Sequence, residues 1–405
     1  MITPGSSAEI KSFTCSPDSI KQRRRLECLT YAILASILGL AWQATLVHSL
    51  YGGNWSALFY HGSEGRGLPD EPAFAGTYLF QKDIGFDGQY YRIVAHDPFR
   101  TRDNLRYLDI PVMRYRRILV PALAYGLACG RQPYIDAGFI ATILLFLFLG
   151  VYWLARYAVL CDRTAKWGWA FLLAPATLAG LERGAVDTVL TSLTIGFAVY
   201  LREQSRYCLL LVLVAAGLCR ETGLCLALAC AAVSFLKKDW KGLILSWAST
   251  LPALGWYVFV QMRSPNSYSP TLLRLPLTDL VQTMIHHDVS YIKFGAFFVQ
   301  FAYYAAVCGM LLAFFLSIWL SSKGWTGADG LAALAFTMIG LLLQPPGLWL
   351  QPYHFGRVLA PLLVLLGLEY FRTDEWWKAL PVCLVSPAIL LVSVASAVRV
   401  LKHSI

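Results

Sequence analysis

Long apolar runs separated by short polar breaks are the feature that most constrains how this chain of 405 residues folds. The sequence is 57% hydrophobic and only 14% charged, whereas roughly 25% of the residues of an average soluble domain are charged. A charge at the centre of a bilayer costs about 3 kcal/mol, so charges are expected between membrane spans. The pattern therefore predicts an all-α integral membrane protein.

The first apolar run extends from about Cys28 to Leu50. Further runs near the length of a bilayer crossing lie at 134–155, 167–182, 185–201, 242–262, 293–320, 328–344, 355–371 and 379–401. The stretch 207–236 is too long for one span, and Arg220-Glu221 interrupts it, so we interpret it as two short helices with an ion pair at their turn. These segments together predict about eleven transmembrane helices.

The polar ends of the runs predict an orientation. Residues 1–25 are expected to form a disordered cytoplasmic tail, and residues 26–405 a single polytopic domain. The first run is too long for a cleaved signal peptide and has no Ala-x-Ala site, so we interpret it as an uncleaved anchor. With the N-terminus inside, the cytoplasmic segments hold about twice as many Lys and Arg as the short outer ones. The long loop 51–133 is then extracytoplasmic.

The net charge of +10 does not indicate nucleic-acid binding, because Lys and Arg lie mainly between spans, where they contact anionic lipid. We therefore expect membrane lipids and no nucleic acid as partners, and the oligomeric state stays open. The sequence contains no Asp-x-Asp, Walker loop, Gly-x-Ser-x-Gly or His-Glu-x-x-His motif. Neither a metal nor a cofactor is predicted.

The segment 85–98, just past the first span, combines Asp87, Gln89, Tyr90, Tyr91 and Arg92 in one loop. A short helix is predicted from Asp87 to His96, ended by Asp97-Pro98, with its tyrosines resting on the membrane interface. Two interpretations of Asp87 stay open. Its carboxylate is a general base for a hydroxyl group, or it only caps the helix.

Basic residues on the predicted outer side of the membrane are candidate phosphate contacts, because arginine binds phosphate in a bidentate manner. Arg114, Arg116 and Arg117 open the apolar run 118–129, and the alternative is that they anchor a helix end to lipid. Arg220 and Glu221 are site residues or a structural ion pair. Arg357 is a further phosphate candidate, whereas His354 beside it indicates little by itself.

The polar residues near membrane depth all fall on the predicted outer side, with nothing comparable on the cytoplasmic side. A transporter has to open to both sides and usually contains two related halves, and the sequence shows no internal repeat. The distribution favours an enzyme that works at one face.

The motifs together resemble the GT-C class of polytopic glycosyltransferases. The string Phe86-Asp87-Gly88-Gln89-Tyr90-Tyr91-x-x-x-Ala95 is similar to a signature of the PIG-V-type mannosyltransferase-like branch. A related uncharacterised bacterial membrane family is more similar still, through three further strings. These are Asp97-Pro98 followed by Tyr115-Arg116-Arg117-Ile118-Leu119-x-Pro121, then Arg220-Glu221-Thr222, and then Arg357-x-x-Ala360-Pro361.

The resemblance implies an inverting transfer of a sugar from a polyprenyl-phosphate donor to an acceptor at the extracytoplasmic face of the bacterial inner membrane. Asp87 would be the base, and Arg116, Arg117 and Arg220 would contact the lipid phosphate. One departure is that no second acidic residue stands directly beside Asp87. Two other classes of function stay open, namely a transporter or flippase of a lipid-linked substrate, and a non-catalytic scaffold of envelope polysaccharide assembly.

Overall fold

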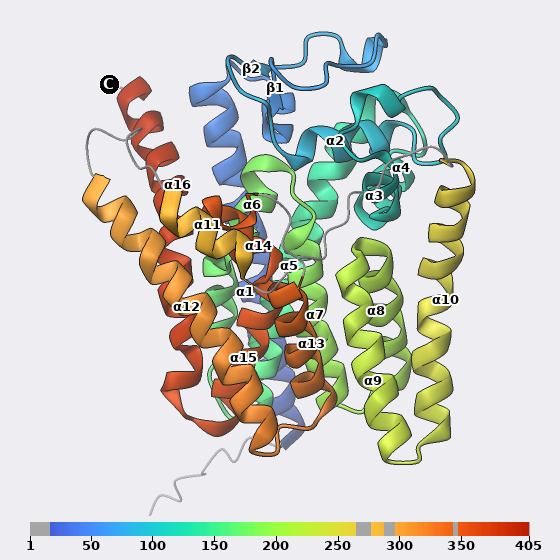
Figure 1. Cartoon of the computed structure of the whole chain (residues 1–405), viewed down its shortest axis with the longest axis vertical. Coiled ribbons are helices and arrows are strands. Elements are labelled where there is room, and N and C mark those ends of the chain that lie inside the picture. The colour runs from blue at the N-terminus through green and yellow to red at the C-terminus, as the bar shows by residue number, and fades with distance from the viewer. Residues whose placement is uncertain (1–16, 265–276, 287–295, 343–346, 405) are drawn as a thin grey trace, which may run out of the picture.

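The computed structural model describes residues 17–264, 277–286, 296–342 and 347–404. In this part of the chain the regular structure is helical except for two short strands, β1 (His61–Gly62) and β2 (Leu79–Phe80), which pair in parallel. The helices form an elongated bundle with a group of short elements over one end (Figure 1). The all-α prediction is confirmed.

Five helices in the described residues are long and apolar enough to cross a membrane. They are α1 (Pro17–Leu50), α5 (Ile135–Leu160), α10 (Trp240–Met262), α12 (Ala296–Ser322) and α16 (Leu380–Ser404). A sixth span results if α14 (Pro352–Val358) and α15 (Ala360–Thr373), which meet at 63°, count as one broken crossing. These features are those of a multi-pass membrane protein.

The remaining apolar helices are shorter than a typical crossing. They are α7 (Asp187–Arg202), α8 (Arg206–Cys219), α9 (Leu224–Leu236) and α13 (Ala328–Leu342), with 13 to 16 residues each. The predicted run 167–182 is divided by Pro175 into the 3₁₀-helix η5 (Ala165–Leu173) and α6 (Pro175–Arg183). By length and composition the described helices therefore do not reach the expected eleven spans.

The stretch 207–236 is divided as predicted. Helix α8 ends at Cys219, Arg220 is extended, and α9 follows the short 3₁₀-helix η6 (Glu221–Gly223). The expected ion pair within this turn is wrong, because Arg220 and Glu221 bind partners in other segments. At the N-terminus, α1 already begins at Pro17, so residues 17–25 of the expected tail are helical, and residues 1–16 lie outside the described part.

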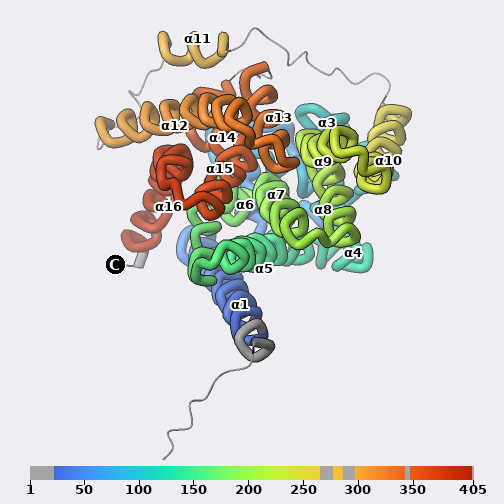
Figure 2. The backbone as a smooth tube through the Cα atoms, turned by 90° about the horizontal axis from the view of Figure 1, so that it is seen from below, coloured from blue at the N-terminus to red at the C-terminus, as the bar shows by residue number. Residues whose placement is uncertain are grey.

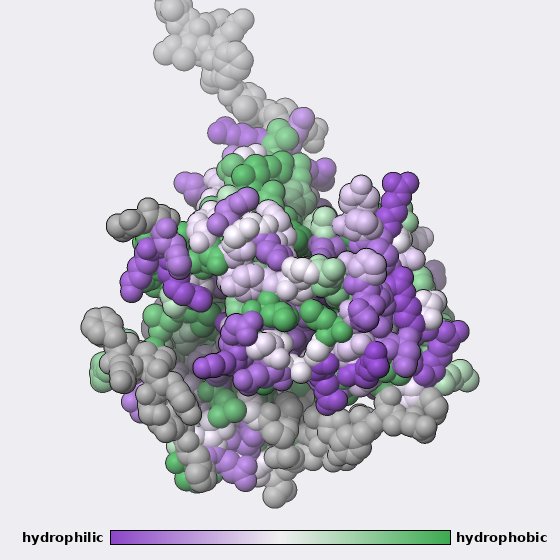
Figure 3. Space-filling model, turned by 90° about the horizontal axis from the view of Figure 1, so that it is seen from above, coloured by the Kyte–Doolittle hydropathy of each residue, from purple (hydrophilic) through white to green (hydrophobic). Residues whose placement is uncertain are grey.

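Residues 51–133, here called the headpiece, cover the upper end of the bundle in Figure 1. Their helices are η1 (Trp55–Phe59), η2 (Pro72–Phe74), α2 (Asp87–His96), η3 (Leu105–Tyr107), α3 (Pro111–Arg116) and α4 (Leu119–Leu127), and η4 (Gln132–Tyr134) leads into α5. In Figure 3 hydrophilic residues form large patches on this face, with hydrophobic residues between them. Tyr91 is 1% exposed, so it does not rest on a membrane interface as the sequence suggested.

Helix α7 holds the centre of the bundle and fixes the depth of the functional residues. It packs against α5, α6, α8 and α15, as the tube view shows (Figure 2). Every residue from Asp187 to Val199 is buried. The hydroxyl of Ser192 donates a hydrogen bond to the carbonyl of Phe146 on α5, 2.6 Å away. A helix buried on all sides holds its first residue, Asp187, in a defined place.

The headpiece approaches the bundle closely where the start of α2 meets the end of α6. A Cβ on Gly88 would lie 2.1 Å from the carbonyl oxygen of Arg183 and 3.0 Å from that of Phe59. Both neighbours are backbone atoms, so they cannot rotate away as a side chain can. This close approach places Asp87, the preceding residue, against the bundle.

We expect Gly88→Ala to lower the stability of the protein by about 1–3 kcal/mol, because the added methyl group forces α2 away from α6. The measurement is the thermal unfolding midpoint in detergent. Gly126→Ala in α4 is the matched control, because a Cβ there meets no atom within 4 Å. Equal midpoints for the two variants would contradict the assigned contact.

Candidate functional site

Asp87 is the first residue of α2, and two arginines bind its carboxylate. Arg114 Nη2 donates to Oδ1 at 2.8 Å, and Arg357 Nη2 lies 2.6 Å from Oδ2. The N-cap position belongs to Phe86, and the structure shows no side-chain capping hydrogen bond there. Asp87 therefore binds arginine instead of capping the helix.

The ion pairs continue into the bundle through Asp187. Arg357 Nη1 donates to Asp187 Oδ2 at 2.9 Å, and Arg220 donates to Oδ1 of the same carboxylate. Arg114 also binds Asp109, with Nε 2.8 Å from Oδ1. We call the alternating series Arg114, Asp87, Arg357, Asp187 and Arg220 the arginine network. It joins α3, α2, α14, α7 and the turn before η6.

A neighbouring pair borders the arginine network. Arg117 Nε donates to Glu221 Oε2 at 3.0 Å, and its Nη1 donates to the hydroxyl of Tyr91, also at 3.0 Å. The guanidinium of Arg114 stands over the rings of Tyr90 and Tyr91, 4.7 and 5.1 Å from their centroids. The tyrosines of the sequence motif therefore hold arginines of the site in place.

Arg183, at the end of α6, is enclosed by aromatic rings. Its guanidinium carbon lies 4.6 Å from the centroids of Tyr60 and Tyr353 and 4.9 Å from that of Phe86. Arg357 contacts the same Phe86 ring at 4.4 Å. Among the described residues Arg183 has no carboxylate within ion-pair distance. It therefore contributes a positive charge that acidic side chains of this part do not compensate.

The arginine network shifts the titration of Asp87. Burial raises the pKa of its carboxyl group, but the charges of Arg114 and Arg357 and their hydrogen bonds outweigh burial and hold the pKa well below the ordinary value of 3.8. Asp87 is therefore ionised throughout the physiological range. Because arginine occupies both of its oxygens, it is a weak base in this arrangement.

Several buried donors of the site have no acceptor among the described residues. They are Arg114 Nη1, Arg220 Nε and Arg357 Nε, and the buried hydroxyl of Tyr353 is also unpaired. The three arginines are 3–8% exposed. Buried guanidinium groups normally use their hydrogen-bonding capacity, since an unpaired buried donor costs about 1–3 kcal/mol. The arrangement suits a small anion with several acceptor oxygens, such as a phosphate group.

The structure does not bring every predicted residue into this site. The side chain of Gln89 binds backbone groups, donating to Ile84 O at 3.0 Å and accepting from Gly62 N at 3.3 Å. Arg116 points away and donates to Gln261 on α10 at 3.1 Å. His354 stands beside the site, with its ring centroid 6.1 Å from that of Phe86. Gln89 therefore has a local structural role, and Arg116 lies outside the arginine network.

The sequence did not assign Asp187 and Arg183 to the site. Asp187 opens an otherwise apolar helix and is 3% exposed. An ionisable residue inside an apolar run marks a functional position by default, so this signal was available. Asp109, which also binds Arg114, lay in an ordinary polar stretch and carried no such signal.

The opposite end of the bundle also contains buried charges, which the sequence did not predict. Glu369 is 3% exposed and accepts hydrogen bonds from Lys378 at 3.1 Å and from Arg372 at 2.6 Å. Within the described residues this cluster has no unpaired buried donor. Buried charges are thus present at both ends of the bundle. In the described residues, the site around Asp87 contains unpaired arginine donors and the Glu369 cluster does not.

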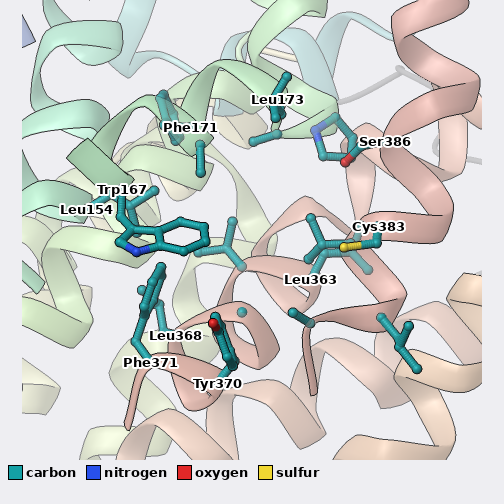
Figure 4. Close-up of a pocket in the computed structure, with 18 of the residues that line it drawn as sticks. Leu154, Trp167, Phe171, Leu173, Leu363, Leu368, Tyr370, Phe371, Cys383 and Ser386 are labelled. Atoms are coloured by element: carbon teal, nitrogen blue, oxygen red, sulfur yellow. The ribbon is translucent and has the colours of Figure 1, made fainter. Parts of the chain in front are cut away.

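A large cavity lies elsewhere, between η5, α15 and α16 (Figure 4). Its volume is about 560 Å³, and its lining is apolar, with Trp167, Phe171 and Phe371 prominent. It has no charged side chain in its lining and does not include the arginine network.

Comparison with protein-family models, curated proteins and solved structures finds no match to this chain.

Arg357 is expected to matter more for stability than an exposed arginine of the same chain. Arg357→Gln removes the cation between Asp87 and Asp187. Loss of one partner from a buried ion pair costs about 3–5 kcal/mol, and the cost here should lie at or below the lower end of this range because Arg114 and Arg220 still pair the two carboxylates. Arg66→Gln, at the exposed surface of the headpiece, should change stability by about 0.5 kcal/mol or less. Thermal unfolding of both variants in the same detergent tests this difference. Similar midpoints would show that Arg357 is not the central link.

Proposed function

We propose that this chain is a GT-C-like glycosyltransferase that uses a polyprenyl-phosphate sugar at the extracytoplasmic face of the bacterial inner membrane. The observation that carries the proposal is the meeting of one buried carboxylate, Asp87, with the arginine network at the headpiece end of an apolar helical bundle. In this proposal the N-terminus is cytoplasmic, the headpiece is extracytoplasmic, and the shorter helices complete about eleven crossings.

Motifs that lie far apart in the sequence converge on this site. Asp87, Arg117, Arg220 and Arg357 belong to four separate strings of the resemblance, and each lies in the arginine network or in the pair beside it. A set of unrelated surface charges has no physical reason to converge in this way. This convergence supports the glycosyltransferase interpretation over the scaffold, which needs no shared site.

The donor phosphate would bind the unpaired arginine donors. Arg114, Arg220 and Arg357 present N–H groups without acceptors in the described part, and Arg183 adds an uncompensated charge beside them. When the bond between the sugar and the phosphate breaks, negative charge grows on the leaving phosphate. Arginines that are already in place stabilise this charge without reorganisation.

Asp87 would then remove the proton from the acceptor hydroxyl. The hydroxyl oxygen forms a bond to the anomeric carbon, the bond from that carbon to the phosphate oxygen breaks, and polyprenyl phosphate leaves with inversion at carbon. A donor phosphate competes with Asp87 for Arg114 and Arg357. This competition would raise the pKa of Asp87 and make it a stronger base when substrate is bound.

Asp87→Asn should abolish transfer, with a loss of at least about 100-fold, because general base catalysis contributes roughly 10²–10⁴. The fold should persist, since Arg114 keeps Asp109 and Arg357 keeps Asp187 as partners. The measurement is transfer of radiolabelled sugar from a panel of polyprenyl-phosphate sugars by protein in nanodiscs, with thermal unfolding as the folding control. Full activity of the variant would contradict the mechanism. In sealed proteoliposomes, movement of the donor across the bilayer without a covalent product would identify a transporter.

The pH dependence separates the free from the substrate-bound protein. In the free protein the pKa of Asp87 is well below 3.8, so kcat/KM should not fall on acidification to pH 4 through protonation of Asp87. In the substrate complex the phosphate draws Arg114 and Arg357 away from Asp87, so Asp87 is protonated at a higher pH than in the free protein. As the pH is lowered, kcat should therefore fall before kcat/KM does. An acid limb at the same pH in both profiles would contradict the competition between phosphate and Asp87.

A further inference from the structure

We infer that a second site, separate from the arginine network, binds an anionic phospholipid at the edge between the headpiece and α10. One acyl chain would lie in an apolar groove, and the phosphate would contact Arg100, Arg116 and Arg263. This inference goes beyond the proposed function and does not rest on it.

The groove has a volume of about 540 Å³ and an entirely apolar lining. Phe99 comes from the headpiece, Ile118 immediately precedes α4, Leu218 comes from α8, and Trp256 and Phe259 come from α10. Helix α10 lies at one edge of the bundle (Figures 1 and 2), and its residues Trp256 and Phe259 line the groove. Helix α10 is one of the helices able to cross a membrane, so its outer face is where lipid chains are expected.

Three arginines gather at the end of α10, beside the groove. Arg100 Nη1 donates to the hydroxyl of Ser264 and to Val260 O, and Arg263 Nη1 donates to Phe99 O at 3.4 Å. Arg116 binds Gln261, as described above. The guanidinium of Arg263 also stands 4.9 Å from the ring centroid of Phe259, which lines the groove. The positive charges therefore adjoin the apolar wall.

In the described part of the chain no carboxylate lies within ion-pair distance of these arginines, although Asp97 attracts Arg100 from farther away. Arg100, Arg116 and Arg263 form no ion pair there, unlike the arginines of the network around Asp87. Each guanidinium carries five N–H donors, and the hydrogen bonds named above use only a few of them. The alternative is that the arginines only stabilise the C-terminal end of α10, whose carbonyl groups attract any cation. One arginine suffices for that role. Three arginines without an ion pair in the described part, next to an apolar groove, fit a lipid that has both a phosphate and acyl chains.

Trp256 fixes the wall between the two parts of this site. Its indole N–H donates to the backbone carbonyl of Tyr115 at 2.7 Å. Tyr115 is fully buried, and the guanidinium of Arg100 lies 5.3 Å from its ring centroid. Tryptophan with one polar and one apolar side is typical of the level of the lipid head groups. The arginines and the apolar groove are thus held next to each other, as a phospholipid with its head group and acyl chain requires.

The first experiment compares lipid binding by native mass spectrometry of the full-length protein in detergent. Dioleoyl phosphatidylglycerol and dioleoyl phosphatidylcholine are added separately. We expect wild type to retain phosphatidylglycerol at least tenfold better than phosphatidylcholine, and Arg100→Gln/Arg116→Gln/Arg263→Gln to lose this preference. Arg66→Gln/Arg106→Gln/Arg131→Gln is the control, because it removes three exposed headpiece arginines and changes the net charge equally. The control should keep the preference.

The second experiment blocks the groove and leaves its arginines in place. A Cβ on Gly255, which lines the groove, meets no atom within 4 Å, so Gly255→Leu fills open space without a clash. We expect this variant to fold and to lose retention of phosphatidylglycerol. Gly126→Leu on α4 is the matched control, because its Cβ also meets no atom within 4 Å and it lies outside the groove lining.

Two outcomes would overturn the inference. The first outcome is that wild type shows no preference for phosphatidylglycerol, or that the triple arginine variant keeps the preference. The arginines would then only bind carbonyl groups at the end of α10 and no lipid phosphate. If Gly255→Leu retains phosphatidylglycerol like wild type, the groove does not hold an acyl chain. Loss of sugar transfer with retained lipid preference would concern only the site around Asp87, so the two proposals fail independently.

Discussion

The bridge that Arg357 forms between Asp87 and Asp187 is the interaction on which the site depends. Its two terminal nitrogens hold one carboxylate from the headpiece and one from the central helix α7. Arg357 reaches both because α14 ends before α15 begins, with a bend of 63°. Pro361, in the first turn of α15, cannot donate its backbone nitrogen and favours this break. A broken helix thus positions the residue that connects headpiece and bundle.

The chemical character of the site follows from unequal pairing of charge. In the described part of the chain, buried donors of the arginine network stay unpaired, while the Glu369 cluster at the opposite end has its partners. A protein that only needs a stable core gains little from buried arginines, because an apolar replacement often stabilises it as much. Retaining several arginines with unused donors around one carboxylate is better explained by binding of an anion, which the proposed donor phosphate provides.

The Arg114-Tyr115-Arg116-Arg117 string shows that arginines adjacent in the sequence do not have to belong to the same site. Residues three apart in a helix share a face, whereas neighbours diverge. Arg114 and Arg116, two apart within α3, reach Asp87 and α10, whereas Arg117, which lies just past the end of α3, reaches Glu221. One basic cluster in the sequence is divided between two sites in space. The alternative of lipid anchoring, which was open for the whole string, is retained for Arg116 in the inferred phospholipid site.

The sequence by itself determined the apolar helices, the break between α8 and α9, and the short helix that begins at Asp87. These features depend on local hydrophobicity and on residues such as Pro98 that end helices. Only the tertiary structure decided that Asp87 binds two arginines instead of capping α2, that Gln89 serves the backbone, and that Asp187 belongs to the site. The reason is physical. Ion pairs between segments up to 270 residues apart, from Asp87 to Arg357, are set by how the helices pack, and no local pattern encodes that distance.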